Sequence, residues 1–438
     1  MRLLEKVGLG RPEVRAWAMY DVANSAFFTT IIGSVFPIYF ASVAAADLDG
    51  PTATARFATA TTIALAISAI LSPFLGALAD FRAAKKRFLA GFLFLGVLAT
   101  AAMWFIHRGD WMLAAVLFIL GNIGASASFV FYDALLPHVA RPDEVDRVST
   151  AGYALGYLGG GVLLAINLAW IQMPRTFGLA DAGQATRLSF LSVAVWWLLF
   201  SIPLLRRVPE PARRLAPGER GDERPLRASF ARLRTTLREL RQYKQAFLLL
   251  VAFLIYNDGI GTIIRMAPIY GAEIGIGKGA LITAVLLVQF VGIPCAFAFG
   301  WLASKIGPKR AVMLSLAVYA LISVVGYFMK TATHFFGLAI LVGMVQGGSQ
   351  ALSRSLFASM VPTHKSSEFF AFFAVFEKFA GILGPLLFAG TIAATGSSRN
   401  AILAVIAFFA IGAVLLSLVD VEAGRKVARE AEARIATS

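Results

Sequence analysis

Residues 88–106 read FLAGFLFLGVLATAAMWFI, an apolar run without a single charged side chain. A helix needs about 20 such residues to cross the hydrocarbon core of a bilayer. A helix is also the expected form of this run, because an open backbone could not satisfy its hydrogen bonds in lipid. The run therefore predicts a membrane-spanning helix.

Similar runs occur along the whole chain. Of its 438 residues 58% are hydrophobic and 15% are charged, against about 25% charged residues in soluble domains. Together the runs predict an all-α polytopic membrane protein with twelve transmembrane helices. The predicted spans are 15–40, 57–80, 88–106, 111–136, 148–171, 188–205, 246–270, 280–303, 311–329, 335–361, 368–393 and 400–419.

Lysine and arginine set the expected orientation. Most of them lie in segments that share one side if the N-terminus is inside, which places both termini in the cytoplasm of a cell (inner) membrane protein. The formal charge of +15 then reflects topology and contact with anionic membrane lipid rather than binding of nucleic acid. One cysteine and four scattered histidines favour neither a disulfide framework nor a metal site, and no cofactor is expected.

The two halves of the chain repeat each other. Gly76-Ala-Leu-Ala ends the second span, and Gly300-Trp-Leu-Ala ends the eighth at the equivalent place. We therefore expect one six-helix bundle over 1–205 and another over 246–419, the parallel duplication on which many secondary transporters are built. Between them, 206–245 is expected to be a cytoplasmic linker whose second part is an amphipathic helix on the membrane surface. Residues 420–438 are expected to be a cytoplasmic tail.

The loop after the second span carries the first resemblance to a known family. Residues 76–87 read GALADFRAAKKR, which resembles the Gly-x-Leu-Ala-Asp-Arg-x-Gly-Arg-Lys signature of the major facilitator superfamily. It departs from that signature at Phe81, Ala83 and Ala84, and the second copy has Ser304 in place of the aspartate. With twelve spans and a repeat, the resemblance implies a transporter of that superfamily, and no enzyme activity.

A narrower resemblance lies in other spans. Residues 17–27 (WAMYDVANSAF), 36–40 (FPIYF), 346–355 (QGGSQALSRS) and 368–385 are similar to the vacuole-effluxer-like branch of the superfamily, named for an autophagy-related amino-acid exporter. This resemblance implies a membrane transporter and leaves its substrate open.

Polar residues inside the predicted spans are the candidate functional residues. An ionised side chain at the centre of a span costs ~2.5–3.5 kcal/mol, so each one needs a compensating contact or a function. The residues expected to contact substrate or a coupling proton are Tyr20, Asp21, Asn24, Asn122, Asn257, Asp258, Arg265, Gln289, Gln346, Gln350, Arg354, Glu377 and Lys378.

Several of these residues have a structural alternative. Asp21 shares a helix face with Asn24 and either faces the cavity or bonds to nearby amides or a lysine. Asp258 either functions or makes a buried hydrogen bond to a neighbouring helix, and Arg265 either functions or extends toward the headgroups. Arg354 either binds a substrate carboxylate or forms a fixed salt bridge at the inner gate.

A second set of residues is expected to gate the pathway. Asp80 and Asp133 lie near the inner surface beside a basic loop, so we expect charge pairs that latch the two halves in the outward-facing state; the resemblance to the superfamily implies the same roles. The residues assigned to gating are Gly76, Asp80, Arg82, Lys85, Lys86, Asp133, Gly300, Lys309 and Arg310.

The sequence thus predicts a monomeric secondary transporter that moves a small solute by alternating access. An Asp or Glu for an amine and Arg354 or Lys378 for a carboxylate suit an amino acid or another zwitterion. Burial disfavours the charged form of a carboxylate, so Asp21, Asp258 or Glu377 could carry a coupling proton, and export is the expected direction. The alternatives are a drug or lipid exporter and, in another class, a transport-inactive sensor or scaffold.

Overall fold

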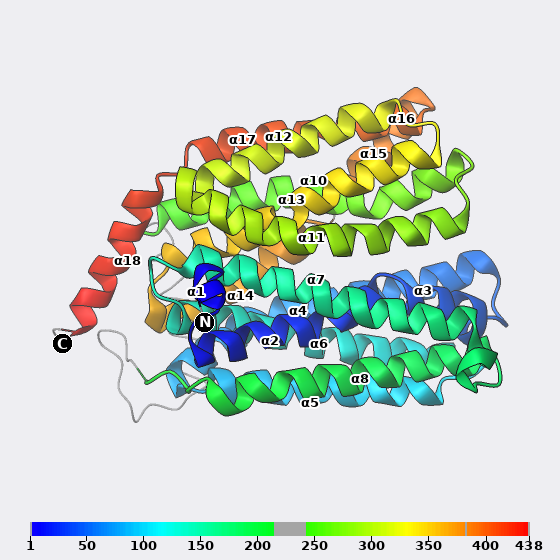
Figure 1. The fold of residues 1–438 in the computed structure, drawn as a ribbon, viewed down its shortest axis with the longest axis horizontal. Helices are drawn as coiled ribbons and strands as arrows, with labels where there is room; N and C mark the ends of the chain where they lie inside the picture. The colour runs from blue at the N-terminus through cyan, green and yellow to red at the C-terminus, as the bar shows by residue number, and fades with distance from the viewer. Residues whose placement is uncertain (1, 214–241, 382, 437–438) are drawn as a thin grey trace.

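A computed structural model describes residues 2–213, 242–381 and 383–436 of the chain. Every regular element in these ranges is helical. The amphipathic helix expected in the second part of the linker lies almost wholly outside the described residues. The helices form two bundles that lie side by side with roughly parallel axes, as Figure 1 shows, and the twofold division expected from the repeat is present.

The first bundle contains six spans, the first of them irregular. That span runs through α2 (Pro12–Ala26), a π-helical turn (Phe27–Ile32), α3 (Val35–Tyr39) and a second π-helical turn (Phe40–Ala44). A short helix, α1 (Arg2–Lys6), precedes it. The other spans are α4 (Gly50–Arg82), α5 (Lys85–Ala102), α6 (Trp111–Val139), α7 (Val145–Gln172) and α8 (Ala182–Arg207).

The second bundle begins at Lys244. Its elements are α10 (Lys244–Glu273), α11 (Lys278–Ile306), α12 (Pro308–Tyr327), α13 (Ala332–Ser359), α14 (Ser366–Phe379), α15 (Leu383–Thr395), α16 (Ser398–Ala404) and α17 (Ile406–Ser417). A final helix, α18 (Val421–Ala436), lies across one end of the molecule, near α10 and the end of α13. Figure 1 shows the N-terminus and α18 at the same end, which we call the terminal end.

The eleventh predicted span, 368–393, is two helices rather than one. Within the described residues, eleven helical segments are long and apolar enough to cross a membrane, and this run supplies none of them because α14 ends at Phe379 and α15 begins at Leu383. Asp258 of α10 explains how a helix can begin there. Its carboxylate accepts hydrogen bonds from the backbone N–H groups of Leu383 at 2.9 Å and Gly384 at 3.0 Å.

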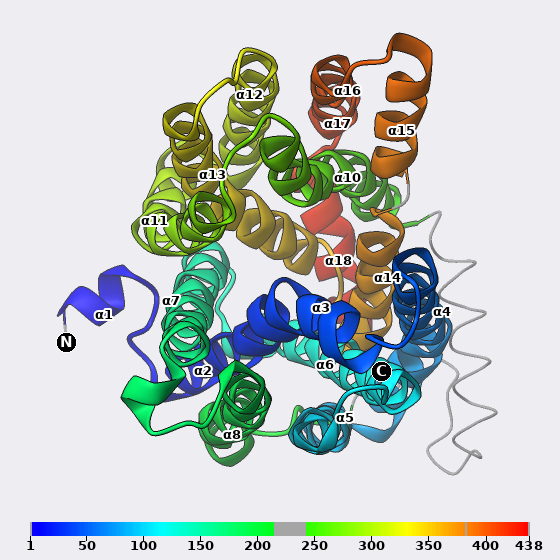
Figure 2. The same ribbon diagram turned by 90° about the vertical axis from the view of Figure 1, so that its right-hand side faces the viewer.

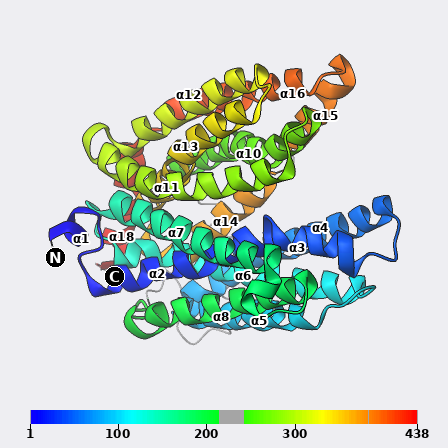
Figure 3. The ribbon, with the colours of Figure 1, turned by 45° about the vertical axis from the view of Figure 1, so that its right-hand side comes forward.

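The two halves of this broken span pack in different places. Figure 2, which looks along the helices, shows α14 beside α4 and α6, while α15 stands with α16 on the far side of the second bundle. The second contact between bundles is made by α7, which packs against α11 and α13; Figure 3 shows α7 and α11 running side by side along this boundary.

The repeated glycines lie at these two contacts. A Cβ atom at Gly76 would come within 2.5 Å of the Ser367 carbonyl oxygen in α14, and one at Gly300 would collide with the Thr150 hydroxyl in α7. A side chain at Gly76 would meet the backbone of the other bundle and push the bundles apart, whereas one at Gly300 would require the Thr150 hydroxyl to rotate away. The motif copies therefore mark equivalent places of close approach between the bundles.

We expect Asp258→Ala to destabilise the protein by about 2 kcal/mol, because two N–H donors at the start of α15 would lose their acceptor in a buried site. The thermal unfolding midpoint of purified protein measures this. Asp181→Ala is the matched control, since Asp181 caps α8 in an exposed position. Equal shifts for the two variants would contradict a special role of Asp258 in supporting the broken span.

Candidate substrate site and gate

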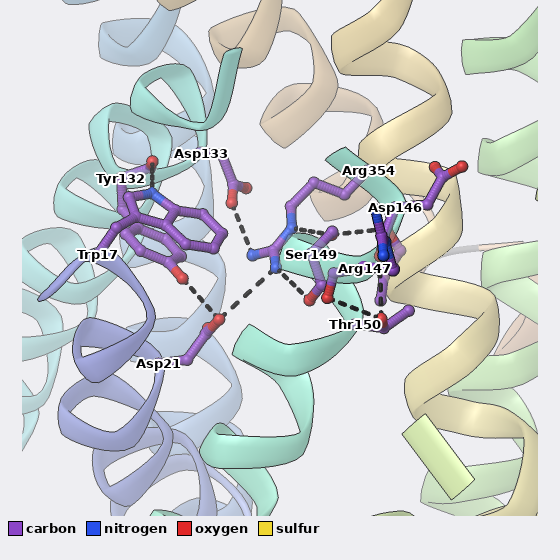
Figure 4. A network of polar contacts seen from close by, with 10 residues as sticks. Trp17, Asp21, Tyr132, Asp133, Asp146, Arg147, Ser149, Thr150 and Arg354 are labelled. Atoms are coloured by element: carbon purple, nitrogen blue, oxygen red, sulfur yellow. Dashed lines mark hydrogen bonds and ion pairs between the residues drawn. The ribbon is translucent and has the colours of Figure 1, made fainter. Parts of the chain in front are cut away.

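The guanidinium group of Arg354 joins the two bundles. The residue belongs to α13 and is 1% exposed. Its Nη1 atom donates to Asp133 of α6 at 3.0 Å, and its Nη2 atom lies 3.6 Å from a carboxylate oxygen of Asp21 in α2. Figure 4 shows the guanidinium between the two carboxylates. A cation of the second bundle is thus held by two anions of the first.

Ser149 accepts two further hydrogen bonds from Arg354. Its Nε atom donates to the Ser149 hydroxyl at 2.9 Å, and Nη2 donates to the Ser149 carbonyl at 3.0 Å. The rings of Trp17, Tyr132 and Tyr153 lie 4.5–5.6 Å from its guanidinium carbon, within the range of cation–π attraction. In this conformation the guanidinium group is held by Asp133, Asp21 and Ser149 and is covered by these three rings.

Aromatic residues fix the position of Asp21. The Tyr132 hydroxyl donates to its carboxylate at 2.6 Å, and the Trp17 indole N–H donates to the Tyr132 carbonyl at 3.0 Å. The Trp17 and Tyr132 rings are stacked with centroids 4.4 Å apart. A Cβ at Gly152 would collide with the Asp21 carboxylate, so α7 needs a glycine at this point.

A further layer of contacts joins the bundles at the terminal end, beyond Arg354. Asp80 forms an ion pair with Lys85 and also accepts the backbone N–H of Glu368 at 3.0 Å, in the first turn of α14. Because the N-terminus of a helix carries partial positive charge, this contact attracts α14 to the end of α4. Nearby, the Ser355 hydroxyl of α13 donates to Asp146 of α7 at 2.5 Å.

The two carboxylates expected to form latching charge pairs have different partners. Asp133 pairs with Arg354 of the other bundle and not with the basic loop after α4, because Asp133 is buried between the bundles. Of the basic residues in that loop, Lys85 alone pairs with Asp80 among the described residues. Arg82 is exposed, and the backbone N–H of Lys86 donates to Glu210 at 3.1 Å.

A polar cavity of about 280 Å³ lies next to the Arg354 network, on the side away from the terminal end. Both bundles line it. Six residues named from the sequence reach this polar cavity: Asp21, Asp133, Gln289, Gln346, Gln350 and Glu377. The three amides have no hydrogen-bond partner among the described residues, and no described cation lies within ion-pair distance of Glu377.

The other predicted residues lie elsewhere. Tyr20 and Asn24 are fully buried within the first bundle, and Asn122 accepts a hydrogen bond from Ser126 at 3.2 Å. Asn257 is buried beside Asp258, whose carboxylate is occupied by α15, and Arg265 is exposed. The side chain of Lys378 lies outside what the structure describes.

The last two gating candidates lie away from the bundle boundary. Lys309 donates to the carbonyl oxygens of Ser417 and Val419 at 2.8 and 2.7 Å, so it caps the end of α17 within the second bundle. Arg310 is exposed beside it. Neither forms a hydrogen bond or ion pair with a described residue of the first bundle.

Sequence reasoning missed several members of the network. Trp17, Tyr132, Ser149 and Tyr153 surround Arg354 but are unremarkable in an apolar sequence rich in aromatic residues. Two of these residues could have been suspected from their neighbours in the sequence, because Tyr132 directly precedes Asp133 and Ser149 lies three residues before Gly152. Nothing in the pattern showed which of these would face α13.

Two helical bundles around a central cavity that is sealed at one end define a transporter of the major facilitator type. The fold is shared with the proton:xylose symporter XylE, with TM-score 0.69, 14% identity, and coverage of 93% of this chain and 95% of that one. The *E. coli* fucose:proton symporter FucP gives TM-score 0.67 at 13% identity over 93% of this chain and 98% of the other. The model of the vacuole effluxer Atg22-like family matches residues 10–429, and the chain belongs to that family.

Two relatives illustrate its range. The chain is 37% identical over 417 residues to the uncharacterized MFS-type transporter YxiO of Bacillus subtilis (strain 168), covering 95% of this chain and 96% of that protein. It is 28% identical over 318 residues to autophagy-related protein 22 of Yarrowia lipolytica (strain CLIB 122 / E 150), covering 67% of this chain and 53% of that protein. The chain therefore matches about half the length of the yeast relative.

We expect Asp80→Asn to open the terminal end. Asparagine can still accept this hydrogen bond but carries no charge, so the variant loses the charge-assisted part of the contact with the start of α14, about 1 kcal/mol or roughly fivefold in the balance of states. A cysteine introduced at the buried Ala351, in a Cys295→Ala background, reports this as faster labelling by a polar thiol reagent.

Asp47→Asn is the control for this measurement, because Asp47 pairs with Arg108 in an exposed position. Unchanged labelling of Asp80→Asn, together with loss of substrate binding, would contradict a latch.

Proposed function

We propose that the protein is a proton-coupled secondary transporter that exports a small amine-bearing solute, such as an amino acid or another zwitterion. The observation that carries this proposal is Glu377. Its carboxylate lines the polar cavity, and no described cation is within ion-pair distance. A carboxylate in such a place can hold a proton or a protonated amine, but not both.

Competition for one carboxylate gives a simple coupling mechanism. A proton that arrives from one side displaces the amine, and the amine displaces the proton on the other side, so the two move in opposite directions. The Arg354 network supports the gating step of this mechanism, because it closes the terminal end of the molecule and leaves the polar cavity present beside it. Rocking of the bundles must separate Arg354 from Asp133 and Asp21 before that end can open.

The proposed orientation places the terminal end in the cytoplasm, as the distribution of lysine and arginine predicts. The state described is then closed to the cytoplasm. Export is supported by the family's description as vacuole effluxers and agrees with proton antiport at an inner membrane. We further propose that one chain is the transporting unit, because both bundles that line the polar cavity come from the same chain.

Export of an amphipathic drug or lipid is the second candidate. A largely apolar cavity adjoins the polar one and favours a cargo with an apolar part. Flux of zwitterionic amino acids and of amphipathic amines through the same purified protein would separate the two candidates.

We expect Glu377→Gln to abolish accumulation driven by a pH gradient in proteoliposomes, because glutamine can neither release a proton nor bind an amine by charge. Labelled amino acids, tested singly as zwitterionic probes, give the measurement. Glu430→Gln on the exposed face of α18 is the matched control. Coupled flux that survives in Glu377→Gln would contradict the assignment, and no flux of any probe by the unmodified protein would favour the sensor or scaffold.

A further inference from the structure

A second cavity lies beside the polar one, within the second bundle. Its volume is about 360 Å³, and it is lined mainly by α10 to α13 with single contributions from α15 and α16. We call it the apolar chamber. It shares Phe28, Thr29, Gln289 and Gln346 with the polar cavity, so these four residues separate two adjoining spaces.

The chamber's lining is aliphatic and aromatic. Leu281, Val288, Phe335 and Phe388 are typical of it, and no charged side chain is among its described lining residues. Protein interiors are close-packed, with few voids larger than a water molecule. A mainly apolar space of this size inside a bundle is therefore suited to an apolar ligand.

One hydroxyl group in the chamber lacks a partner among the described residues. The Tyr270 side chain is 2% exposed and lines the chamber, yet its hydroxyl has no hydrogen-bond partner among the described residues. The other hydroxyls there bond to their own helices, Thr262 to the Asp258 carbonyl at 2.7 Å and Ser323 to the Tyr319 carbonyl at 3.2 Å. Since a buried hydroxyl without a partner is costly, Tyr270 is available to a polar atom of a ligand.

The polar cavity has complementary chemistry. It presents the Glu377 carboxylate and the amides of Gln289, Gln346 and Gln350, whereas Arg354 is held by Asp133, Asp21 and Ser149 and is not among the described lining residues. The described lining thus offers carboxylates to a ligand and no cation. A protonated amine finds an opposite charge at this end of the site, whereas a carboxylate finds only neutral donors among the described lining residues.

We propose that the two cavities form one site for an amphipathic amine, in which Glu377 binds the ammonium group and the apolar chamber takes an aliphatic or aromatic body. This inference rests on the proposed transport function and adds a selectivity rule: the second bundle selects cargo by its apolar size, and a carboxylate on the cargo is not required. A phenolic hydroxyl at the far end of the cargo could bond to Tyr270.

The test uses purified full-length protein in nanodiscs and a series of primary amines from ethylamine to octylamine. Calorimetric binding should tighten by about fourfold for each added methylene until the chamber is filled. Phenethylamine and tyramine extend the series to aromatic bodies, and tyramine should lose its advantage over phenethylamine in Tyr270→Phe.

Two variants that narrow the apolar chamber test whether it binds the apolar part of the ligand. Ala339 on α13 and Ala284 on α11 line the chamber and are 8% and 3% exposed. Ala339→Phe and Ala284→Phe should each bind ethylamine as the unmodified protein does but lose at least tenfold in affinity for octylamine. Ile340→Phe, at the exposed neighbour of Ala339, is the matched control and should keep the full chain-length dependence.

The outcomes are separate from those of the transport assay. Binding that does not depend on chain length, or narrowing variants that bind octylamine normally, would overturn the chamber assignment. Unchanged amine affinity in Glu377→Gln would overturn the ammonium site. If amines fail to bind while amino acids are transported, this inference fails and the proposed function stands; if amines bind but no solute crosses the membrane, the proposed function fails instead.

Discussion

A buried arginine between two carboxylates sets the relation of the two bundles. Taking Arg354, Asp133 and Asp21 out of water is costly, and the cost is met only while all three stay together. Removing one partner of such a group typically costs about 3–5 kcal/mol, since the others remain buried and uncompensated. The Ser149 hydroxyl accepts from Arg354 and the Tyr132 hydroxyl donates to Asp21, and these two hydrogen bonds help to fix the arrangement of the charges. Separation of the bundles must therefore hydrate the whole group at once.

The spans and the twofold plan could be predicted because they depend on local properties of the chain. Runs such as 88–106 must be helical in lipid whatever surrounds them. The partners of Arg354 could not be predicted, because Asp133 and Asp21 are distant in sequence and any of several intramembrane carboxylates could have faced it. The break in 368–393 was missed for the same reason, because the acceptor that allows a new helix to start is Asp258, on another span.

The interior of the molecule is polarised along its length. Charges and hydroxyls gather toward the terminal end, around Arg354 and Asp80, whereas the space within the second bundle is apolar. Electrostatic attraction is strongest where water is excluded, so the ion pairs at the charged end can hold the two bundles together in the closed state and release them in the open state. The apolar chamber attracts apolar groups by the hydrophobic effect, which does not depend on their orientation. Glu377 lies in the polar cavity, which adjoins both.

The broken eleventh span has a consequence for how the bundles move. Its first half, α14, is packed against α4 and α6, while its second half, α15, is anchored to α10 through Asp258. One polypeptide segment is thus a member of both bundles, and the bundles cannot turn past each other as two separate solids. When the terminal end opens, either α14 separates from Asp80 or the angle between α14 and α15 changes.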